Sequence, residues 1–235
     1  MESNLKLFAG RVVLVTGGSR GIGFATAQAF LQQGARVAIC GRDAARLAAA
    51  EKALTPSGTI YAAVADVGDH DQVGDLVSST RRQLGEIDVL VNNAGRLWSG
   101  PFAEQPPETI DEVLDCNVKG VMIMTRAALP GMLARGSGVI VNVASGAGLT
   151  GFAELATYCA SKFAVVGFTA ALAEELRGSG VRTYAVCPGS VDTDMQQEYS
   201  GKRVGMAPAR VAEKILALAG PRAPARPGHC LEIGN

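Results

Sequence analysis

Short apolar runs alternate with longer amphipathic segments along almost the whole chain. The short runs are rich in valine, isoleucine and leucine, which is typical of strands buried on both faces of a parallel sheet. Small or polar residues follow most of these runs and stop the strand. We therefore predict seven strands, at residues 11–16, 36–40, 59–65, 88–91, 139–143, 181–187 and 229–233.

The longer segments have the spacing of helices. They predict helices at residues 24–33, 44–54, 70–84, 156–177 and 209–219, and two more within 107–133 that meet at Asn117–Gly120. Strands that alternate with helices from end to end indicate an α/β protein. The expected fold is a single Rossmann-type, doubly wound parallel sheet of about seven strands with helices on both faces. We find no internal repeat or linker, so residues 1–235 form one predicted domain.

One long stretch has no clear period. Residues 191–207 are polar and contain two glycines. We predict that they form a short substrate loop, which could act as a mobile lid over a binding site.

The first predicted strand runs into a glycine-rich turn, Gly17-Gly-Ser-Arg-Gly21-Ile-Gly23. Glycines let the backbone turn tightly and approach a phosphate, and the helix that follows presents free N–H groups. A plain strand-to-helix turn would have the same composition. Because the turn follows the first strand directly, we favour a dinucleotide site, which in such sheets lies at the carboxyl ends of the strands.

The second strand ends at Gly41, and Arg42 follows it. At this position a carboxylate would bind the 2′-hydroxyl of NAD, whereas an arginine accommodates the 2′-phosphate of NADP. Arg42, with Arg20 in the glycine-rich turn, therefore favours NADP(H) over NAD(H). The alternative is that Arg42 is simply solvated. Asp43 is expected to cap the next helix.

Tyr158 and Lys162 are four residues apart in a predicted helix, so they lie on one face. A nearby ammonium favours the phenolate, which should lower the pKa of Tyr158 and make it an acid–base catalyst. Ser145 follows the fifth strand and should face the same crevice. A tyrosine and a lysine at this spacing are, on their own, more often an ordinary surface pair.

Charge and composition narrow the function classes. The chain has 22 basic and 22 acidic side chains, which does not suggest binding to nucleic acid or to an anionic membrane. Residues 1–10 do not resemble a targeting segment, so we expect a cytoplasmic protein. The five cysteines lack ligand spacing and are expected to be reduced and mostly buried. With two histidines, no metal site is expected.

Taken together, these motifs resemble the short-chain dehydrogenase/reductase (SDR) family over nearly the full length. The brief loop after Thr193 resembles its 3-oxoacyl-[acyl-carrier-protein] reductase branch. The matching residues are Thr16–Gly23, Asp66, Asn92–Gly95, Asn117, Ser145, Tyr158, Lys162 and Pro188–Thr193.

The resemblance implies a proton relay beside a hydride donor. Tyr158 would be the general acid or base, Lys162 would lower its pKa and bind the nicotinamide ribose, and Ser145 would hold the substrate oxygen. Asn117 would anchor a water linked to Lys162, although an asparagine at a helix break more often binds backbone groups. Many family members are tetramers, so a homotetramer or homodimer is expected. The implied cofactor contacts are Gly17, Ser19, Arg20, Gly21, Ile22, Gly23, Arg42, Asp66, Val67, Asn93, Ala94, Gly95, Tyr158, Lys162, Pro188, Gly189, Val191 and Thr193.

The sequence thus predicts an NADP(H)-dependent oxidoreductase that acts on a small-molecule carbonyl or secondary alcohol. Two alternatives stay open: a non-catalytic NADP-binding sensor or partner protein, and an NAD-linked alcohol dehydrogenase. The substrate itself depends on loop side chains whose arrangement does not follow from their order.

Overall fold

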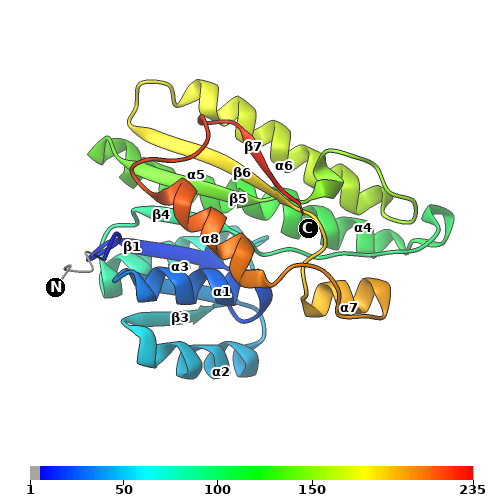
Figure 1. The fold of residues 1–235 in the computed structure, drawn as a ribbon, viewed down its shortest axis with the longest axis horizontal. Coiled ribbons are helices and arrows are strands. Elements are labelled where there is room, and N and C mark those ends of the chain that lie inside the picture. Colours follow the sequence, from blue (N-terminus) through cyan, green and yellow to red (C-terminus); the bar gives the residue numbers. More distant parts are fainter. Residues whose placement is uncertain (1–5, 235) are drawn as a thin grey trace.

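In the computed structural model, which describes residues 6–234, a seven-stranded parallel sheet lies between two layers of helices (Figure 1). The strand order β3-β2-β1-β4-β5-β6-β7 confirms the predicted doubly wound topology. The expectation that residues 1–10 are not a targeting segment falls partly on residues 1–5, which lie outside the described residues. The strands are β1 (Val12–Thr16), β2 (Arg36–Gly41), β3 (Ile60–Val64), β4 (Val89–Asn92), β5 (Gly138–Val143), β6 (Val181–Pro188) and β7 (Cys230–Ile233).

Each face of the sheet has its own hydrophobic core. On one face, α1 and α8 pack against the sheet through residues such as Phe30 and Ile215. On the other face, α3 and α5 contribute Leu76 and Met124. All residues of β1, β4 and β5 are buried, as strands covered on both faces require. The helices are α1 (Gly21–Gln32), α2 (Ala44–Leu54), α3 (His70–Leu84), α4 (Pro107–Leu114), α5 (Gly120–Arg135), α6 (Ala156–Glu175), α7 (Asp194–Ser200) and α8 (Pro208–Ala219).

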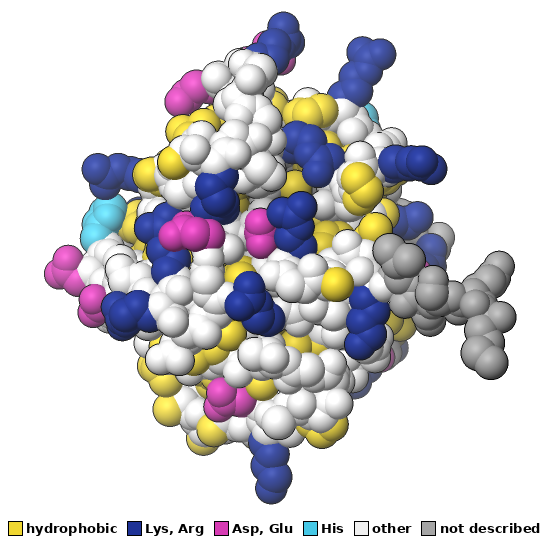
Figure 2. Space-filling model, turned by 90° about the vertical axis from the view of Figure 1, so that its left-hand side faces the viewer, with side chains coloured by type: hydrophobic (Ala, Val, Ile, Leu, Met, Phe, Trp, Pro, Cys, Tyr) yellow, Lys and Arg dark blue, Asp and Glu magenta, His cyan; other side chains and the backbone are white. Residues whose placement is uncertain are grey.

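The order in which strands are added to the sheet reverses between β3 and β4. After β3 at one edge, the chain returns to place β4 beside β1. Ligands of doubly wound sheets bind at this kind of reversal, outside the carboxyl ends of the strands. On the face shown in Figure 2, basic side chains are scattered with acidic ones between them.

The predicted loop at residues 191–207 contains a helix, α7, which corrects the prediction. Thr193 begins this helix by accepting a hydrogen bond from the backbone N–H of Gln196, and Gly201 ends it in the left-handed conformation (φ +69°). Seven residues are too few to show a helical period in the sequence. The base of this segment is fixed by a bridge between Val191 and Met206, both of which are buried. We call residues 191–206 the lid.

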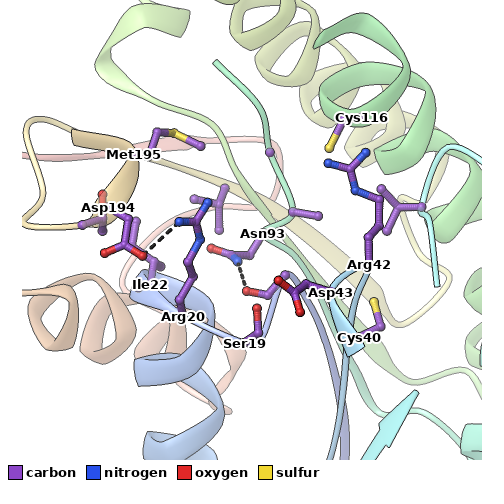
Figure 3. Close-up of a pocket in the computed structure, with 18 of the residues that line it drawn as sticks. Ser19, Arg20, Ile22, Cys40, Arg42, Asp43, Asn93, Cys116, Asp194 and Met195 are labelled. Atoms are coloured by element: carbon purple, nitrogen blue, oxygen red, sulfur yellow. Dashed lines mark hydrogen bonds and ion pairs between the residues drawn. The ribbon is translucent and has the colours of Figure 1, made fainter. Parts of the chain in front are cut away.

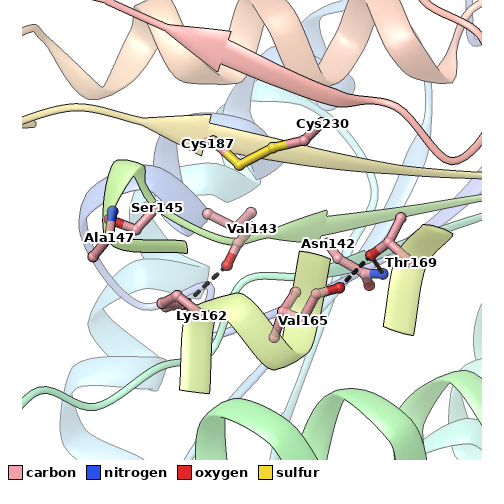
Figure 4. The surroundings of a disulfide bond; sticks show 9 residues. All are labelled: Asn142, Val143, Ser145, Ala147, Lys162, Val165, Thr169, Cys187 and Cys230. Atoms are coloured by element: carbon pink, nitrogen blue, oxygen red, sulfur yellow. Dashed lines mark hydrogen bonds between the residues drawn. A yellow bond between two sulfur atoms is a disulfide. The ribbon is translucent and has the colours of Figure 1, made fainter. Parts of the chain in front are cut away.

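A second correction concerns the cysteines. Cys187 of β6 and Cys230 of β7 form a disulfide, with their Cα atoms 6.3 Å apart (Figure 4), so these two are not reduced. They are 43 positions apart in sequence, and only the pairing of the two strands brings them together. Cys230 lies opposite Ala185, two residues from Cys187, so both thiols point to the same face. Cys40, Cys116 and Cys159 are free and buried, as predicted.

By length and composition alone, α6 is apolar enough to cross a membrane. Half of its most apolar window is buried inside the domain, where Val165 and Leu172 join the cores. A core helix of a soluble domain passes the same test. Its apolar character is therefore explained by packing against the sheet.

Candidate active site

The glycine-rich turn joins β1 to α1 in a conformation that side chains would obstruct. Gly17 has a positive φ (+65°), and a Cβ atom there would lie 2.9 Å from the Cα atom of Ala94. A Cβ atom on Gly23 would collide with the carbonyl oxygen of Gly17. No side chain caps the start of α1, so its first N–H groups remain available to a phosphate.

The turn is locked to the end of β4. The hydroxyl of Thr16 accepts hydrogen bonds from the backbone N–H groups of Asn93 and Ala94, at 2.9 Å each. The side-chain amide of Asn93 donates to the carbonyl oxygens of Thr16 (2.9 Å) and Gly17 (3.2 Å). Asn93 therefore shapes the turn, and its amide nitrogen is already committed to backbone groups.

A pocket of about 320 Å³ lies at the carboxyl ends of the strands (Figure 3). Its wall includes residues of both the glycine-rich turn and α6. Gly23, Pro188, Gly189 and Val191 are not part of its wall, and Cys40, Cys116, Asp194 and Met195 are wall residues that the sequence reasoning missed. The predicted contacts that do line it are Gly17, Ser19, Arg20, Gly21, Ile22, Arg42, Asp66, Val67, Asn93, Ala94, Gly95, Tyr158, Lys162 and Thr193.

The two arginines that favoured NADP both line the pocket, and both are paired with carboxylates. Arg42 lies 3.6 Å from Asp66. Arg20 lies 2.9 Å from Asp194 and 3.6 Å from Glu198, both on α7. The structure therefore brings the predicted cations to the cofactor pocket, but each already has a counter-ion.

Asp43 caps α2, as predicted. Its carboxylate accepts a hydrogen bond of 3.0 Å from the backbone N–H of Arg46. It also pairs with the Arg46 guanidinium at 3.2 Å.

Tyr158 and Lys162 are buried at the other end of the pocket, on the first turns of α6. The Lys162 Nζ atom donates to the carbonyl oxygen of Val143 (2.9 Å; Figure 4) and lies 5.6 Å from the centre of the Tyr158 ring. The helix therefore places both groups as predicted.

The electrostatics of this pair differ from the prediction. Burial raises the pKa of Tyr158 to about 12, although a hydrogen bond with Ser145 lowers it in part. Burial also lowers the pKa of Lys162 to about 8. The expected lowering of the tyrosine pKa is thus wrong for the protein groups alone, because desolvation outweighs the hydrogen bond with Ser145. A phenol with this pKa is protonated at neutral pH, which is the form that a general acid needs.

Asn117 is completely buried in a short π-helical turn, residues 115–119, between α4 and α5. Its side chain accepts from the backbone N–H of Arg96 (2.8 Å) and donates to the Arg96 carbonyl oxygen (2.9 Å). It also donates to the hydroxyl of Ser161 (2.9 Å), a residue that the sequence reasoning did not single out. Asn117 thus ties the segment after Gly95 to the helix that carries Tyr158 and Lys162.

Ser145 begins a short turn after β5 and accepts a hydrogen bond from the backbone N–H of Ala147 (3.1 Å). Ala147, Leu155, Tyr158 and Cys159 form a small apolar cluster. The hydroxyls of Ser145 and Tyr158 therefore lie beside an apolar wall, as expected for a pocket that holds a small organic substrate.

A doubly wound sheet with a glycine-rich turn, a pocket at the carboxyl ends of its strands, and a serine, a tyrosine and a lysine nearby defines a nucleotide-binding class of oxidoreductases. The comparisons with known proteins make this more specific. The chain belongs to the short-chain dehydrogenase family, whose sequence model matches residues 11–203. Its predicted position near the ketoacyl-reductase branch is also confirmed by the similarities below.

The chain is 39% identical over 231 residues to 2-(R)-hydroxypropyl-CoM dehydrogenase of Xanthobacter autotrophicus, covering 89% of this chain and 91% of that protein. An actinorhodin polyketide ketoreductase variant, solved with NADPH, is 36% identical with a TM-score of 0.90 and 95% coverage of both chains. The 3-ketoacyl-(acyl-carrier-protein) reductase from Brucella melitensis, complexed with NADH, is 30% identical with a TM-score of 0.91, covering 96% of this chain and 97% of that one.

Proposed function

We propose that this oxidoreductase transfers a hydride between NADP(H) and a carbonyl or secondary alcohol, with Tyr158 as the general acid or base. The observation that carries the proposal is that Tyr158 and Lys162 both line the cofactor pocket, with Ser145 close enough to Tyr158 to affect its pKa. The cofactor would lie between the glycine-rich turn and Lys162, and when bound it supplies or accepts the hydride.

In the reduction direction, the protonated phenol of Tyr158 donates its proton to the carbonyl oxygen of the substrate. The Ser145 hydroxyl, which lowers the pKa of the same phenol, holds that oxygen in place. Lys162 stabilises the phenolate that remains, because its ammonium group lies on the same helix face one turn away. In the oxidation direction, the phenolate takes the proton from the alcohol.

NADP(H) is the proposed cofactor because two arginines, Arg20 and Arg42, line the pocket where a 2′-phosphate would lie. The relatives do not decide between the cofactors, since one similar structure was solved with NADPH and another with NADH. Fluorescence titrations with NADPH and NADH test this point. Tighter binding of NADH would contradict it and favour an NAD-linked dehydrogenase.

Replacing Tyr158 by Phe tests the catalytic proposal. General acid–base groups contribute about 10²- to 10⁴-fold to rate, so turnover of a carbonyl substrate by Tyr158→Phe should fall by that factor while NADPH still binds. Tyr61→Phe is a matched control, because this tyrosine lies on β3 outside the pocket. Unchanged turnover in Tyr158→Phe would refute the assigned role.

The non-catalytic alternative predicts cofactor binding without turnover. A panel of ketones, aldehydes, quinones and 3-oxoacyl thioesters distinguishes the two, with cofactor oxidation followed by absorbance. NADPH binding without turnover of any of them would favour the sensor or partner protein.

We also propose a cytoplasmic homo-oligomer. Met122 and Leu133 on α5 and Phe163 on α6 are large apolar side chains that are more than two-fifths exposed. A second copy could cover them, in line with the resemblance. Light scattering coupled to gel filtration tests this, and a monomer at micromolar concentration would contradict it.

A further inference from the structure

Asp194, the first residue of α7, is the centre of a small ion-pair network between the lid and the cofactor pocket. One carboxylate oxygen contacts Arg20 of the glycine-rich turn at 2.9 Å (Figure 3). The other contacts Arg203, at the far end of the lid, at 2.6 Å. The two arginines together lower the pKa of Asp194. The hydrogen bond from Arg20 is the largest cause of this lowering. The carboxylate is therefore charged at any physiological pH.

The lid and the glycine-rich turn also touch directly. A Cβ atom on Gly21 would lie 3.1 Å from the methyl carbon of Thr193. At its base the lid is fixed by backbone hydrogen bonds from Asp192 to Met206 (2.9 Å) and from Met206 to Ser190 (3.0 Å). The Arg20–Asp194 pair therefore joins α7 to the glycine-rich turn, while the base of the lid is fixed separately.

Arg20 has two competing partners. Arg20 lines the cofactor pocket together with Arg42 and Arg46, yet in this structure its guanidinium is held by Asp194 and Glu198. A guanidinium that forms a direct contact with a carboxylate has fewer N–H groups left for a phosphate. All three side chains are more than a third exposed, so the contact is weak enough to exchange.

We propose that Asp194 is a specificity-determining residue for the cofactor, because it withholds Arg20 from the 2′-phosphate of NADP(H) and holds it against the lid. This rests on the NADP(H) preference proposed above. Closure of the lid and recognition of the phosphate then compete for one side chain. NADP(H) should loosen the lid relative to NAD(H), which has no 2′-phosphate to attract Arg20.

The test is a comparison of dissociation constants for NADPH and NADH in Asp194→Asn, which keeps the shape of the side chain but removes its charge. The ratio of NADPH affinity to NADH affinity should rise by a factor of about 2 to 5, the range of a weak, exposed charge contact. Asp192→Asn is the matched control, because Asp192 is on the same lid and pairs with Arg203 but not with Arg20. It should leave the ratio unchanged.

A double variant identifies the cause. In Arg20→Gln the change from Asp194 to Asn should no longer alter the ratio, since the withheld guanidinium is gone. A rise that persists in the Arg20→Gln background would overturn the proposal, and so would an unchanged ratio in Asp194→Asn. Loss of binding of both cofactors in Asp194→Asn alone would also overturn it, because the carboxylate would then be needed for binding.

Limited trypsin digestion gives a second readout in the unaltered protein. Lys202 and Arg203, which follow the end of α7, are exposed cleavage sites. Saturating NADPH should leave them more sensitive than saturating NADH, and equal sensitivity would count against the competition. These measurements need no substrate, so their failure is distinguishable from a failure of the proposed reaction, which shows as lost turnover.

Discussion

The two sides of the candidate site are held in place by different forces. Around Tyr158, the positions are set by hydrogen bonds among buried groups: Asn117 is fully buried and Lys162 is 5% exposed. Across the pocket, the lid is held by ion pairs in solvent, where the side chains of Asp194 and Arg203 are 37% and 53% exposed. Buried hydrogen bonds fix geometry because breaking them leaves unsatisfied groups, whereas exposed ion pairs exchange partners at little cost.

A buried polar chain extends this difference into the core. The Asn92 amide donates to Asn142 (2.9 Å), and the Asn142 amide donates to Thr169 of α6 (2.8 Å; Figure 4). This chain runs from β4 through β5 to α6, one residue away from Asn93 and from Val143, which accepts from Lys162. It fixes the helix that carries Tyr158 and Lys162 against the strands that lead into the pocket.

The largest effect is expected from breaking the rigid side. Asn117→Ala removes three hydrogen bonds, so the N–H of Arg96, the carbonyl oxygen of Arg96 and the hydroxyl of Ser161 each lose one partner. We expect the free energy of unfolding to fall by about 2–4 kcal/mol and turnover to fall at least about 10-fold. Urea denaturation and initial rates measure the two. A variant with full activity and stability would show that this side is not rigid.

The burial of Lys162 on the rigid side should make the free energy of unfolding depend on pH. The pKa of Lys162 is about 8 in the folded protein, below the ordinary value. Above that pKa and up to about 10.4, the unfolded chain binds more protons than the folded one, so this group makes the free energy of unfolding rise with pH. The total rise is on the order of 3 kcal/mol.

The free energy of unfolding of Lys162→Met should lack this rise. Between about pH 8 and 10.4 the unaltered protein should therefore gain stability relative to the variant. Denaturation at several pH values measures it. The phenol of Tyr158, with a pKa of about 12, has the opposite sign above pH 10 and is common to both. A constant difference across the window would mean that Lys162 is not desolvated.

The smallest effect is expected on the lid. Arg203→Gln removes the contacts with Asp194 and Asp192. Exposed pairs contribute about 0.2–1 kcal/mol, so the midpoint of unfolding should hardly move, while trypsin should cut at Lys202 more quickly. Raising salt should bring the unaltered protein toward the variant. If Arg203→Gln lowered the free energy of unfolding as much as Asn117→Ala, the two sides of the site would not differ in how they are held.

Much of the fold could be predicted from local patterns. The bounds of α3 agree with the prediction to the residue, because its amphipathic period is long and Asp69 and Gly85 mark its ends. Tyr158 and Lys162 meet because their contact depends on one helix turn. Asp43 caps α2 for the same local reason.

The parts that the sequence did not show depend on distant partners or on short segments. The Cys187–Cys230 disulfide needs two strands to align, and the carboxylates opposite Arg20 lie 174 and more positions away. The pKa of Tyr158 depends on burial, which helix spacing does not reveal. α7 is too short to have a period of its own.

The bridge between Val191 and Met206 has a further meaning for how such a protein can change. It holds the two ends of the lid together through backbone contacts of buried residues. The residues between Val191 and Met206 therefore form a surface segment with fixed ends. Insertions or replacements between these two residues should leave the sheet and Tyr158 undisturbed. The side chains of this segment can therefore vary without rebuilding the rest of the site.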